Sequence, residues 1–254
     1  MNTFTNLRDD NYTLAGNNFT FDIHSQTCAG HQKNTTGFDY FLVVGRKIHL
    51  DKRKNPPVYD KYTYGNIVYN GNETYKGIIK GIESGLYDLH VYQLIPGGLL
   101  GKYYSNTFFS QETSPEFSRV DAVINFTWIY GSTSSAVEFY PGVHWEGCIM
   151  SKYSEWHSFW IRANGCIRFW IDGVLVLDFW DRNLGETKVH TSHYLNAYTF
   201  HEIVLEHREF SGGGFIQLLW SSKNNPLQVI PSNSLFKKVH YASLCFMKIF
   251  FGMT

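Results

Sequence analysis

Apolar and polar residues alternate with a period of two along much of the chain, a pattern that predicts β-strands. In residues 86–94, Tyr87, Leu89 and Val91 share one face, and the other face carries Leu86, Asp88, His90 and Tyr92. Residues 19–23 alternate in the same way, while residues 38–44 are typical of a buried strand. Helical periodicity is weak everywhere. The pattern therefore predicts an all-β protein.

Short turn signals connect several of these strands. Asp172-Gly173 separates the apolar runs 166–171 and 174–179, and Asn70-Gly71 separates 67–69 from 74–79. A two-residue Asp-Gly or Asn-Gly loop between apolar runs predicts a β-hairpin. We also expect residues 200–208 and 215–221 to pair across a glycine-rich turn at 211–214, and residues 52–61 to form a charged loop.

Pro96-Gly97-Gly98 interrupts the strand pattern and predicts a domain boundary. We expect a first domain at residues 1–95 and a second at 96–236. Residues 237–254 form an apolar tail that lacks turn residues and is too short to span a bilayer. Three interpretations of the tail stay open: a docking helix, the beginning of a longer chain, and an artefact of the gene model.

Composition supports the β class and excludes some partners. Aromatic residues make up 17% of the chain and charged residues 17%, with a net charge of zero. Large aromatic and β-branched residues suit pleated sheets. A neutral chain without a basic patch predicts no nucleic-acid partner, and no apolar run is long enough to predict a membrane span. The first residues lack the apolar core of a signal peptide, so an internal piece of a secreted protein and a cytoplasmic scaffold both stay open.

Cysteine spacing predicts no zinc ribbon, because the chain has no C-x-x-C. Cys148 and Cys166 lie in apolar segments that the pattern allows to be neighbouring strands, so a disulfide and a pair of buried thiols are both open. N-x-[ST] sequons indicate a secretory route and possible glycosylation. They begin at Asn11, Asn18, Asn34, Asn72 and Asn125.

The second half resembles the PA14 domain family over about residues 97–236. Six ordered motifs carry the resemblance: Gly98-Leu99-Leu100 with Tyr103-Tyr104; Ile124 to Trp128; Val143-x-Trp145-x-Gly147; Phe159 to Trp180 with its Asp172-Gly173 turn; Leu218-x-Trp220; and Val229-Ile230-Pro231. The resemblance implies a β-sandwich or barrel. Trp145, Trp170 and Trp220 are expected in its core, where large aromatics usually pack.

The resemblance also implies a glycan site in loops at one end of the sandwich. Calcium-dependent members hold Ca²⁺ with two adjacent Asp residues, and here Ala163-Asn164 stands at that position. Because paired carboxylates supply the charge that Ca²⁺ needs, calcium as a cofactor is doubtful. Asp172 is expected to serve its own turn. The ligand-binding residues expected at the loop end are Asn164, Gly165, Trp180, Asp181, Asn183 and Asn224.

Residues 13–94 resemble a filamin-type immunoglobulin-like repeat. The matching residues are Ala15-Gly16 with Phe19 to Phe21, Gly37 to Val43, and a closing pattern of Thr74-Tyr75 followed by Ser84 to Val91. The resemblance implies an immunoglobulin-like β-sandwich that serves as a spacer or a protein-docking module. We therefore expect an immunoglobulin-like β-sandwich followed by a PA14-type β-sandwich or barrel.

No catalytic signature stands out, and we expect no enzyme. His190, His193, His201 and His207 form the densest histidine cluster, but their spacing fits neither H-E-x-x-H nor a zinc finger. We interpret them as surface or turn histidines. The leading hypothesis is an extracellular or cell-surface glycan-binding adhesion module. The alternatives are a structural component of a larger assembly, acting through protein contacts, and a targeting fragment of an enzyme.

Overall fold

The computed structural model describes most of the chain, in nine segments. They comprise residues 12–24, 40–49, 58–71, 74–107, 114–128, 141–180, 186–210, 214–240 and 247–252. The chain divides into two compact units. The first comprises residues 1–94 and 239–254, and the second comprises residues 95–238. The second unit is therefore inserted between two segments of the first.

The first unit is built from strands alone among its described residues. They are β1 (Tyr12–Leu14), β2 (Asn18–His24), β3 (Tyr40–His49), β4 (Val58–Gly71), β5 (Thr74–Lys80), β6 (Gly85–Pro96) and β19 (Met247–Gly252). Their order is β2-β5-β4-β3-β6-β19-β1, in which only the β1–β19 pair is parallel.

Strand β4 changes its pairing partner partway along its length. It pairs with β3 as far as Gly65 and with β5 from Asn66 onward. A Cβ at Gly65 would lie 2.7 Å from the carbonyl oxygen of Ile78, so only glycine fits where β4 changes partner. A core of Phe21, Phe41, Val43, Tyr75, Ile79, Tyr87, Leu89 and Val91 packs inside. The alternation read in residues 86–94 is thus confirmed.

Two expectations for this unit change. Residues 58–61, expected in a loop, begin β4, because they pair with the end of β3. The tail contains no docking helix at residues 247–252, where β19 pairs antiparallel with β6. A six-residue apolar segment is too short for its periodicity to distinguish a helix from a strand. Pairing with the edge of β6 therefore determines that it forms a strand.

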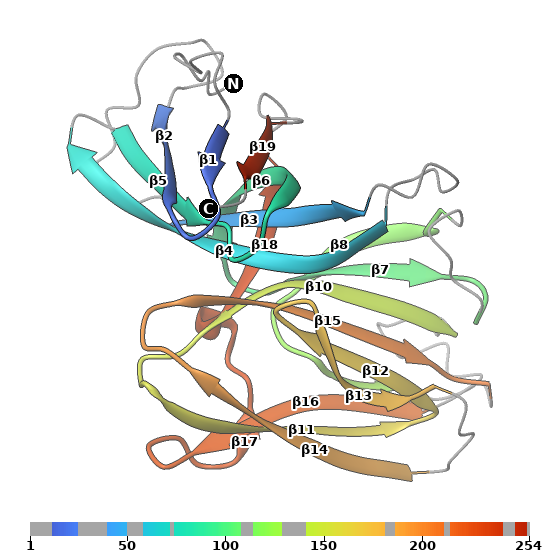
Figure 1. The fold of residues 1–254 in the computed structure, drawn as a ribbon. Helices are drawn as coiled ribbons and strands as arrows, with labels where there is room; N and C mark the ends of the chain where they lie inside the picture. The colour runs from blue at the N-terminus through green and yellow to red at the C-terminus, as the bar shows by residue number, and fades with distance from the viewer. Residues whose placement is uncertain are drawn as a thin grey trace. The chain divides into compact units, whose positions relative to one another are not determined.

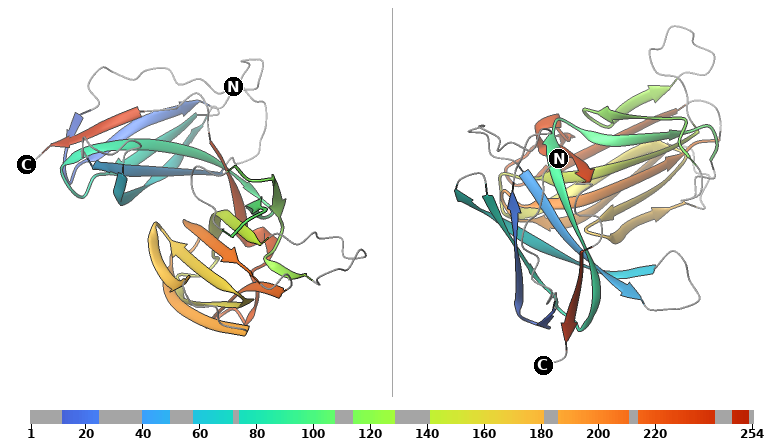
Figure 2. Two further views of the ribbon diagram at one scale, coloured as in Figure 1. Left: turned by 90° about the vertical axis from the view of Figure 1, so that its right-hand side faces the viewer. Right: turned by 90° about the horizontal axis from the view of Figure 1, so that it is seen from above.

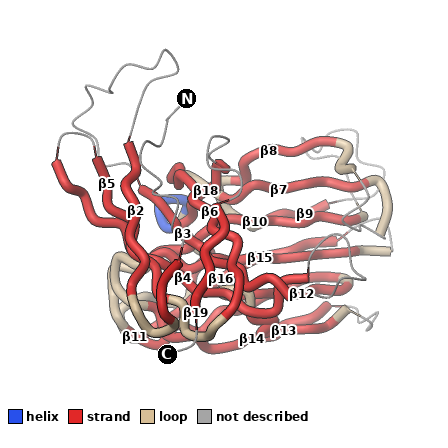
Figure 3. The backbone as a smooth tube through the Cα atoms, turned by 45° about the horizontal axis from the view of Figure 1, so that its top comes forward, coloured by secondary structure: helices blue, strands red, loops and turns tan. Residues whose placement is uncertain are grey.

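The second unit is also made of strands (Figure 1). They are β7 (Leu99–Tyr104), β8 (Phe117–Asp121), β9 (Asn125–Trp128), β10 (Gly142–Met150), β11 (Glu155–Asn164), β12 (Cys166–Ile171), β13 (Val174–Phe179), β14 (Glu186–Leu195), β15 (Phe200–Arg208), β16 (Gly214–Ser222), β17 (Gln228–Val229) and β18 (Leu235–His240). The one helical element of the described residues is a short 3₁₀ turn, Ser232–Ser234 (Figure 3).

These strands form a two-layer sandwich (Figure 2). One layer runs β13-β12-β15-β10, and β10 continues to β7 at one end and to β18 at the other. The second layer runs β14-β11-β16, and β16 is extended by β9 and β17. Every other residue of β11 and β12 faces inward, so one apolar core lies between the layers. The expected all-β sandwich is confirmed.

The Asp-Gly hairpin is present, but the glycine-rich one is not. Asp172 and Gly173 have φ of 50° and 75°, as a type I′ turn requires, and β12 pairs with β13. Strands β15 and β16 do not pair: β15 lies in one layer and β16 in the other. A glycine-rich connection permits a crossover as well as a hairpin, and here burial of both strands against the common core selects the crossover.

Two expectations about the core are corrected. Trp145 and Trp220 are buried as expected, whereas Trp170 is half-buried and points away from Phe169 and Ile171 on β12. Cys148 and Cys166 are both buried and are not bonded to each other, so the disulfide between them is absent. Strand β15 separates their strands, and they face opposite ends of it, far beyond disulfide reach.

Asp121 is the polar centre of the opening motif. It is 5% exposed, and its carboxylate accepts hydrogen bonds from Trp145 Nε1 (2.7 Å), Arg119 Nε (2.7 Å) and the Tyr103 hydroxyl. A Cβ at Gly101 would lie 2.5 Å from the same carboxylate, which explains the glycine. The family motif thus encodes a buried hydrogen-bonded cluster between β7, β8 and β10.

Candidate functional site

Ala163 and Asn164, where the PA14 resemblance implies the calcium position, end β11 and contain no carboxylate pair. Ala163 is fully buried, with its methyl group in the core. Gly165 has φ of 88°, and a Cβ there would lie 2.3 Å from the carbonyl oxygen of Arg208. The Asn164-Gly165 turn therefore requires glycine and carries the chain from one layer to the other.

Neighbouring groups already occupy the polar atoms of this turn. His207 Nε2 donates a hydrogen bond to the backbone oxygen of Asn164 at 2.6 Å. Complete burial lowers the pKa of His207, so the imidazole is neutral. Glu209 is 3% exposed beside the turn and accepts a bond from the Phe210 N–H at 2.9 Å. Sequence reasoning missed Glu209, because its position after β15 becomes adjacent to the turn only in the folded sandwich.

Trp180 lies against arginine side chains. The guanidinium carbons of Arg208 and Arg168 lie 4.2 and 4.7 Å from its ring centroid, within cation–π range. Arg208 Nη2 also donates to the Trp180 carbonyl, and Asp178 Oδ1 accepts from the Trp180 N–H at 3.2 Å. These contacts hold the half-buried Trp180 side chain in one position. Asp181 and Asn183, predicted beside it, lie outside the described residues.

Asn224 lies at the opposite end of β11 from Asn164. Its backbone N–H and its Nδ2 donate to the Glu155 carboxylate at 3.2 and 2.8 Å. Hydrogen bonds from Ser222 and Asn224 lower the pKa of Glu155. Glu155 and Asn164 are the first and last residues of β11, so they are roughly 30 Å apart at strand rise. Asn164 and Asn224 therefore do not share one loop site.

The outward side of β11 and its neighbours presents aromatic and polar side chains together, and we call it the β11 face. Along β11 it comprises Trp156, Ser158, Trp160, Arg162 and Asn164, which all point away from the core. Trp156 is 65% exposed. Sequence reasoning did not single out this row, because period two also fits a strand whose large aromatics face inward.

Cross-strand pairs order the β11 face. The Trp156 and Tyr194 rings meet edge to face at 5.9 Å, and the hydroxyl oxygens of Ser158 and Ser192 are 3.3 Å apart. Trp160 stacks on His190 at 4.3 Å. Other contacts hold the neighbouring positions: Lys188 Nζ lies 5.1 Å from the Trp160 ring, Trp160 Nε1 donates to Ser221 Oγ at 3.4 Å, and Arg162 Nη1 donates to Gln217 Oε1 at 3.1 Å.

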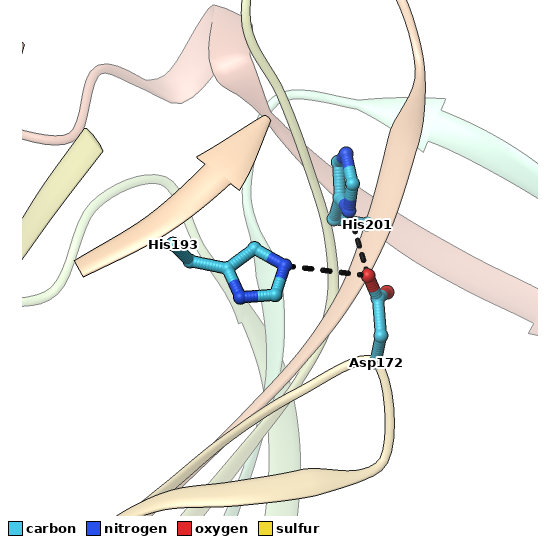
Figure 4. A group of neighbouring side chains, drawn as sticks. All are labelled: Asp172, His193 and His201. Atoms are coloured by element: carbon cyan, nitrogen blue, oxygen red, sulfur yellow. Dashed lines mark hydrogen bonds and ion pairs between the residues drawn. The ribbon is translucent and has the colours of Figure 1, made fainter. Parts of the chain in front are cut away.

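A second group of polar side chains gathers at the Trp156 end of the sandwich (Figure 4). Asp172 Oδ2 lies 2.7 Å from His201 Nδ1 and 3.8 Å from His193 Nε2. Asp172 does serve its turn, as expected, but its carboxylate also contacts two of the four histidines. Of the other two, His190 belongs to the β11 face and His207 to the Asn164 turn. Asp172, His193 and His201 have a donor set that can ligate a metal ion.

Two sequon asparagines are accessible in the described residues. Asn18 and Asn125 are exposed, and Asn125 Oδ1 accepts a bond from Gln217 Nε2 at 2.8 Å. Asn11, Asn34 and Asn72 lie outside the described residues. Within the described segments, no helix combines the length and apolarity that a membrane crossing needs.

The second unit is a two-layer β-sandwich. It contains the strand–Asp-Gly–strand hairpin and a turn at Gly165 that connects the two layers. These features define a β-sandwich module of the PA14 type. The model of the PA14 domain family matches residues 96–234, more than half of the chain. The chain belongs to the PA14 family.

Several known proteins are similar to this chain over part of their length or of its own. The curated anti-sigma-I factor RsgI3 of Acetivibrio thermocellus is 33% identical over 141 residues, which cover 55% of this chain and 21% of that protein. A solved anti-sigma factor domain-containing protein is 21% identical, covers 87% of this chain and 84% of its own, and has a TM-score of 0.49. The PA14 sugar-binding domain of an RTX adhesin is 14% identical, with coverages of 56% and 98% and a TM-score of 0.44.

Proposed function

We propose that the chain is a non-enzymatic, extracellular or cell-surface binding module whose PA14 unit binds carbohydrate through the β11 face, without calcium. The observation that carries the proposal is the row from Trp156 through Trp160 on the outward side of β11. Large exposed aromatics flanked by hydroxyl and amide groups are typical of ligand-binding surfaces.

The geometry of the row suits a chain of sugar rings. An indole offers a flat apolar surface to the C–H face of a sugar, and its edge remains available for polar contacts. Trp156 and Trp160 are four positions apart on one strand, so they are roughly 13 Å apart along it. Ser158 and Ser192 lie between them and supply hydroxyls for hydrogen bonds. An oligosaccharide therefore fits the row better than a single sugar does.

The ligand-binding residues that the sequence predicted at the loop end are proposed as additional contacts beside the β11 face. Asn164 and Gly165 end the row on one side, with Trp180, Asp181 and Asn183 proposed as further contacts there. Asn224 follows the sheet at the Trp156 end, where it bonds to Glu155. Because Ala163 faces the core and brings no carboxylate, binding is expected to persist in EDTA.

Glycan arrays with and without calcium, followed by calorimetry on the hits, test the proposal. Trp156→Ala and Trp160→Ala are each expected to weaken binding about tenfold, because an aromatic contact contributes about 1 kcal/mol beyond its area. Leu227→Ala is the matched control, since Leu227 is 54% exposed on the same unit but lies outside the row. Trp180→Ala reports on the loop end alone.

The outcomes separate three explanations. Loss of affinity in the Trp156 and Trp160 variants alone supports the β11 face, whereas loss in the Trp180 variant alone moves the site to the loop end. Absence of any glycan signal under both conditions refutes carbohydrate binding altogether. Mass spectrometry that finds Asn18 or Asn125 glycosylated would support the extracellular location.

A second candidate is a structural or protein-docking role. The similarity to an anti-sigma-I factor favours it, and the edge-to-face Trp156–Tyr194 pair is also typical of protein interfaces. In this scheme the first unit, as a filamin-type immunoglobulin-like repeat, serves as a spacer. Light scattering at high concentration tests for self-association, and a monomer there would count against an assembly of identical copies.

A further inference from the structure

We propose that Asp172, His193 and His201 form a binding site for a divalent transition metal of the zinc class, which joins the two layers of the PA14 sandwich. The site is independent of the glycan proposal. It also differs from the family's calcium position, because Asp172 and Asn164 lie at opposite ends of the sandwich: the Asn164 turn precedes β12 and Asp172 follows it.

The three side chains come from separate elements and from both layers. Asp172 is in the turn after β12, and His201 is on β15 of the same layer. His193 is on β14, at the edge of the other layer. Figure 4 shows both imidazoles directed at the Asp172 carboxylate. A shared ion would therefore connect the free edge strand of one layer to the opposite layer.

The backbone holds the carboxylate in position before any ion arrives. The Asp172 N–H donates to the Glu202 carbonyl, and the Glu202 N–H donates to Asp172 Oδ1, each at 2.8 Å. Oδ1 is thereby fixed, and Oδ2 is directed to the two histidines. Fixed second contacts of this kind orient metal ligands.

Unusual backbone geometry is concentrated here. Asp172 and Tyr198 have φ of 50° and 57°, and they are the two non-glycine residues with positive φ in the described part of the chain. One supplies the carboxylate, and the other lies in the connection between His193 and His201. The Tyr198 N–H bonds to the Ser151 carbonyl at 2.8 Å, which anchors that connection. The Asp172 conformation is the one its type I′ turn requires, and the turn thereby fixes where the carboxylate begins.

The donor set selects the metal class. Two imidazole nitrogens and one carboxylate oxygen suit zinc, cobalt and nickel rather than calcium, which prefers oxygen alone. Neighbouring ligands of a tetrahedral zinc are roughly 3.3 Å apart, given metal–ligand distances of about 2.0 Å. The observed separations of 2.7 and 3.8 Å bracket this value, so small side-chain rotations suffice. The side chains of Asp172 and His193 are partly exposed, at 21% and 30%, so an ion in solution can reach them.

Binding requires a change in the His201 proton. Without metal, Nδ1–H donates to Asp172 Oδ2, and Nε2 accepts the Asn196 N–H at a long 3.4 Å. Metal at Nδ1 displaces that proton to solvent, and Nε2 then takes up a proton from solvent, so that the long bond from Asn196 is lost. The Asn196 amide is consequently a reporter of occupancy.

Zinc chloride titrated into EDTA-treated, desalted protein tests the proposal by calorimetry, and cobalt chloride gives an independent absorption signal. Saturable one-to-one binding is expected. His193→Ala should weaken zinc binding at least tenfold. The variant should remain folded, because the distance of 3.8 Å between His193 Nε2 and Asp172 Oδ2 is too long for a hydrogen bond, so little stability is lost with it. Asp172→Asn should also lose binding, while its remaining amide oxygen keeps the bond from the Glu202 N–H.

His190→Ala is the matched control, since His190 lies on the same strand but points to the β11 face. Its zinc affinity should equal that of the unmodified protein. Zinc should also raise the melting temperature of the unmodified protein and of His190→Ala by the same amount, and raise that of His193→Ala by less at the same zinc concentration. An amide spectrum should show the Asn196 signal shifting with zinc.

Equal zinc binding by the His193→Ala variant and the unmodified protein would overturn the proposal. Equal losses in the His190 and His193 variants would also overturn it, because they would indicate adventitious binding by surface histidines. The absence of saturable binding in the unmodified protein would have the same consequence.

Discussion

Removal of the Asp121 carboxylate tests how the PA14 unit is held together. In Asp121→Ala, the Trp145 indole N–H and the Tyr103 hydroxyl lose their shared acceptor, and both residues are 0% exposed. Burial, reinforced by the bond to Asp121, raises the pKa of Tyr103, so the hydroxyl keeps its proton and needs an acceptor.

The magnitude follows from the two orphaned donors. Each unsatisfied buried donor costs about 1–3 kcal/mol, and the pair with Arg119 adds at most about 1 kcal/mol because that side chain is 35% exposed. The expected loss is about 2–7 kcal/mol, a large share of the roughly 5–15 kcal/mol that stabilises a domain. At roughly 2–4 °C per kcal/mol, the melting temperature should fall by roughly 4–28 °C.

Tryptophan fluorescence during urea unfolding measures this loss in the second unit alone, because all 7 tryptophans lie between residues 128 and 220. Asp178→Ala is the control: its side chain is 47% exposed and pairs with Arg168, so its loss should stay below about 0.5 kcal/mol. A loss below about 1 kcal/mol in Asp121→Ala would refute the buried-cluster argument.

Two further predictions use the same assay. Gly165→Ala should lower the free energy of unfolding by about 1–3 kcal/mol, because its Cβ would collide with the Arg208 carbonyl at a positive φ. Gly97→Ala is the control: its φ is also positive, but the space around it is open, so its loss should be smaller. Equal losses in the two variants would contradict the collision. Burial opposes protonation of His144, but its hydrogen bonds with Glu146 and Glu206 outweigh burial and raise its pKa. A raised folded pKa adds stability that is complete below pH of about 6.5 and disappears as the pH rises through the folded value. The stability difference between the unmodified protein and His144→Gln should therefore shrink as the pH rises above about 6.5, and a constant difference would show that His144 does not titrate in this way.

Local signals predicted local structure well. Asp172-Gly173 predicted its hairpin, and the alternation at Tyr87, Leu89 and Val91 predicted the core face of β6. These succeed because turn geometry and side-chain period depend on a few consecutive residues. The ordered PA14 motifs likewise identified the family that the match over residues 96–234 shows.

Pairings between distant segments were predicted less well. Residues 200–208 and 215–221 were expected to pair and lie in different layers, and Cys148 and Cys166 were expected as possible neighbours and are separated by β15. A strand with one apolar face satisfies its own pattern in either layer. The choice depends on which layer has a free edge once the other strands are in place, and no single segment contains that information.

The candidate sites show the same division. The sequence by itself determined the β class, the sandwich and the loss of the carboxylate pair at Ala163-Asn164, since each depends on residue types at known spacing. Only the tertiary structure placed Asn224 at the far end of β11 from Asn164, put Trp156 and Trp160 in one outward row, and brought Asp172 to His193 and His201. Those three residues belong to different strands and turns, and they meet because two layers pack on a common core, an arrangement set by long-range burial rather than by local pattern.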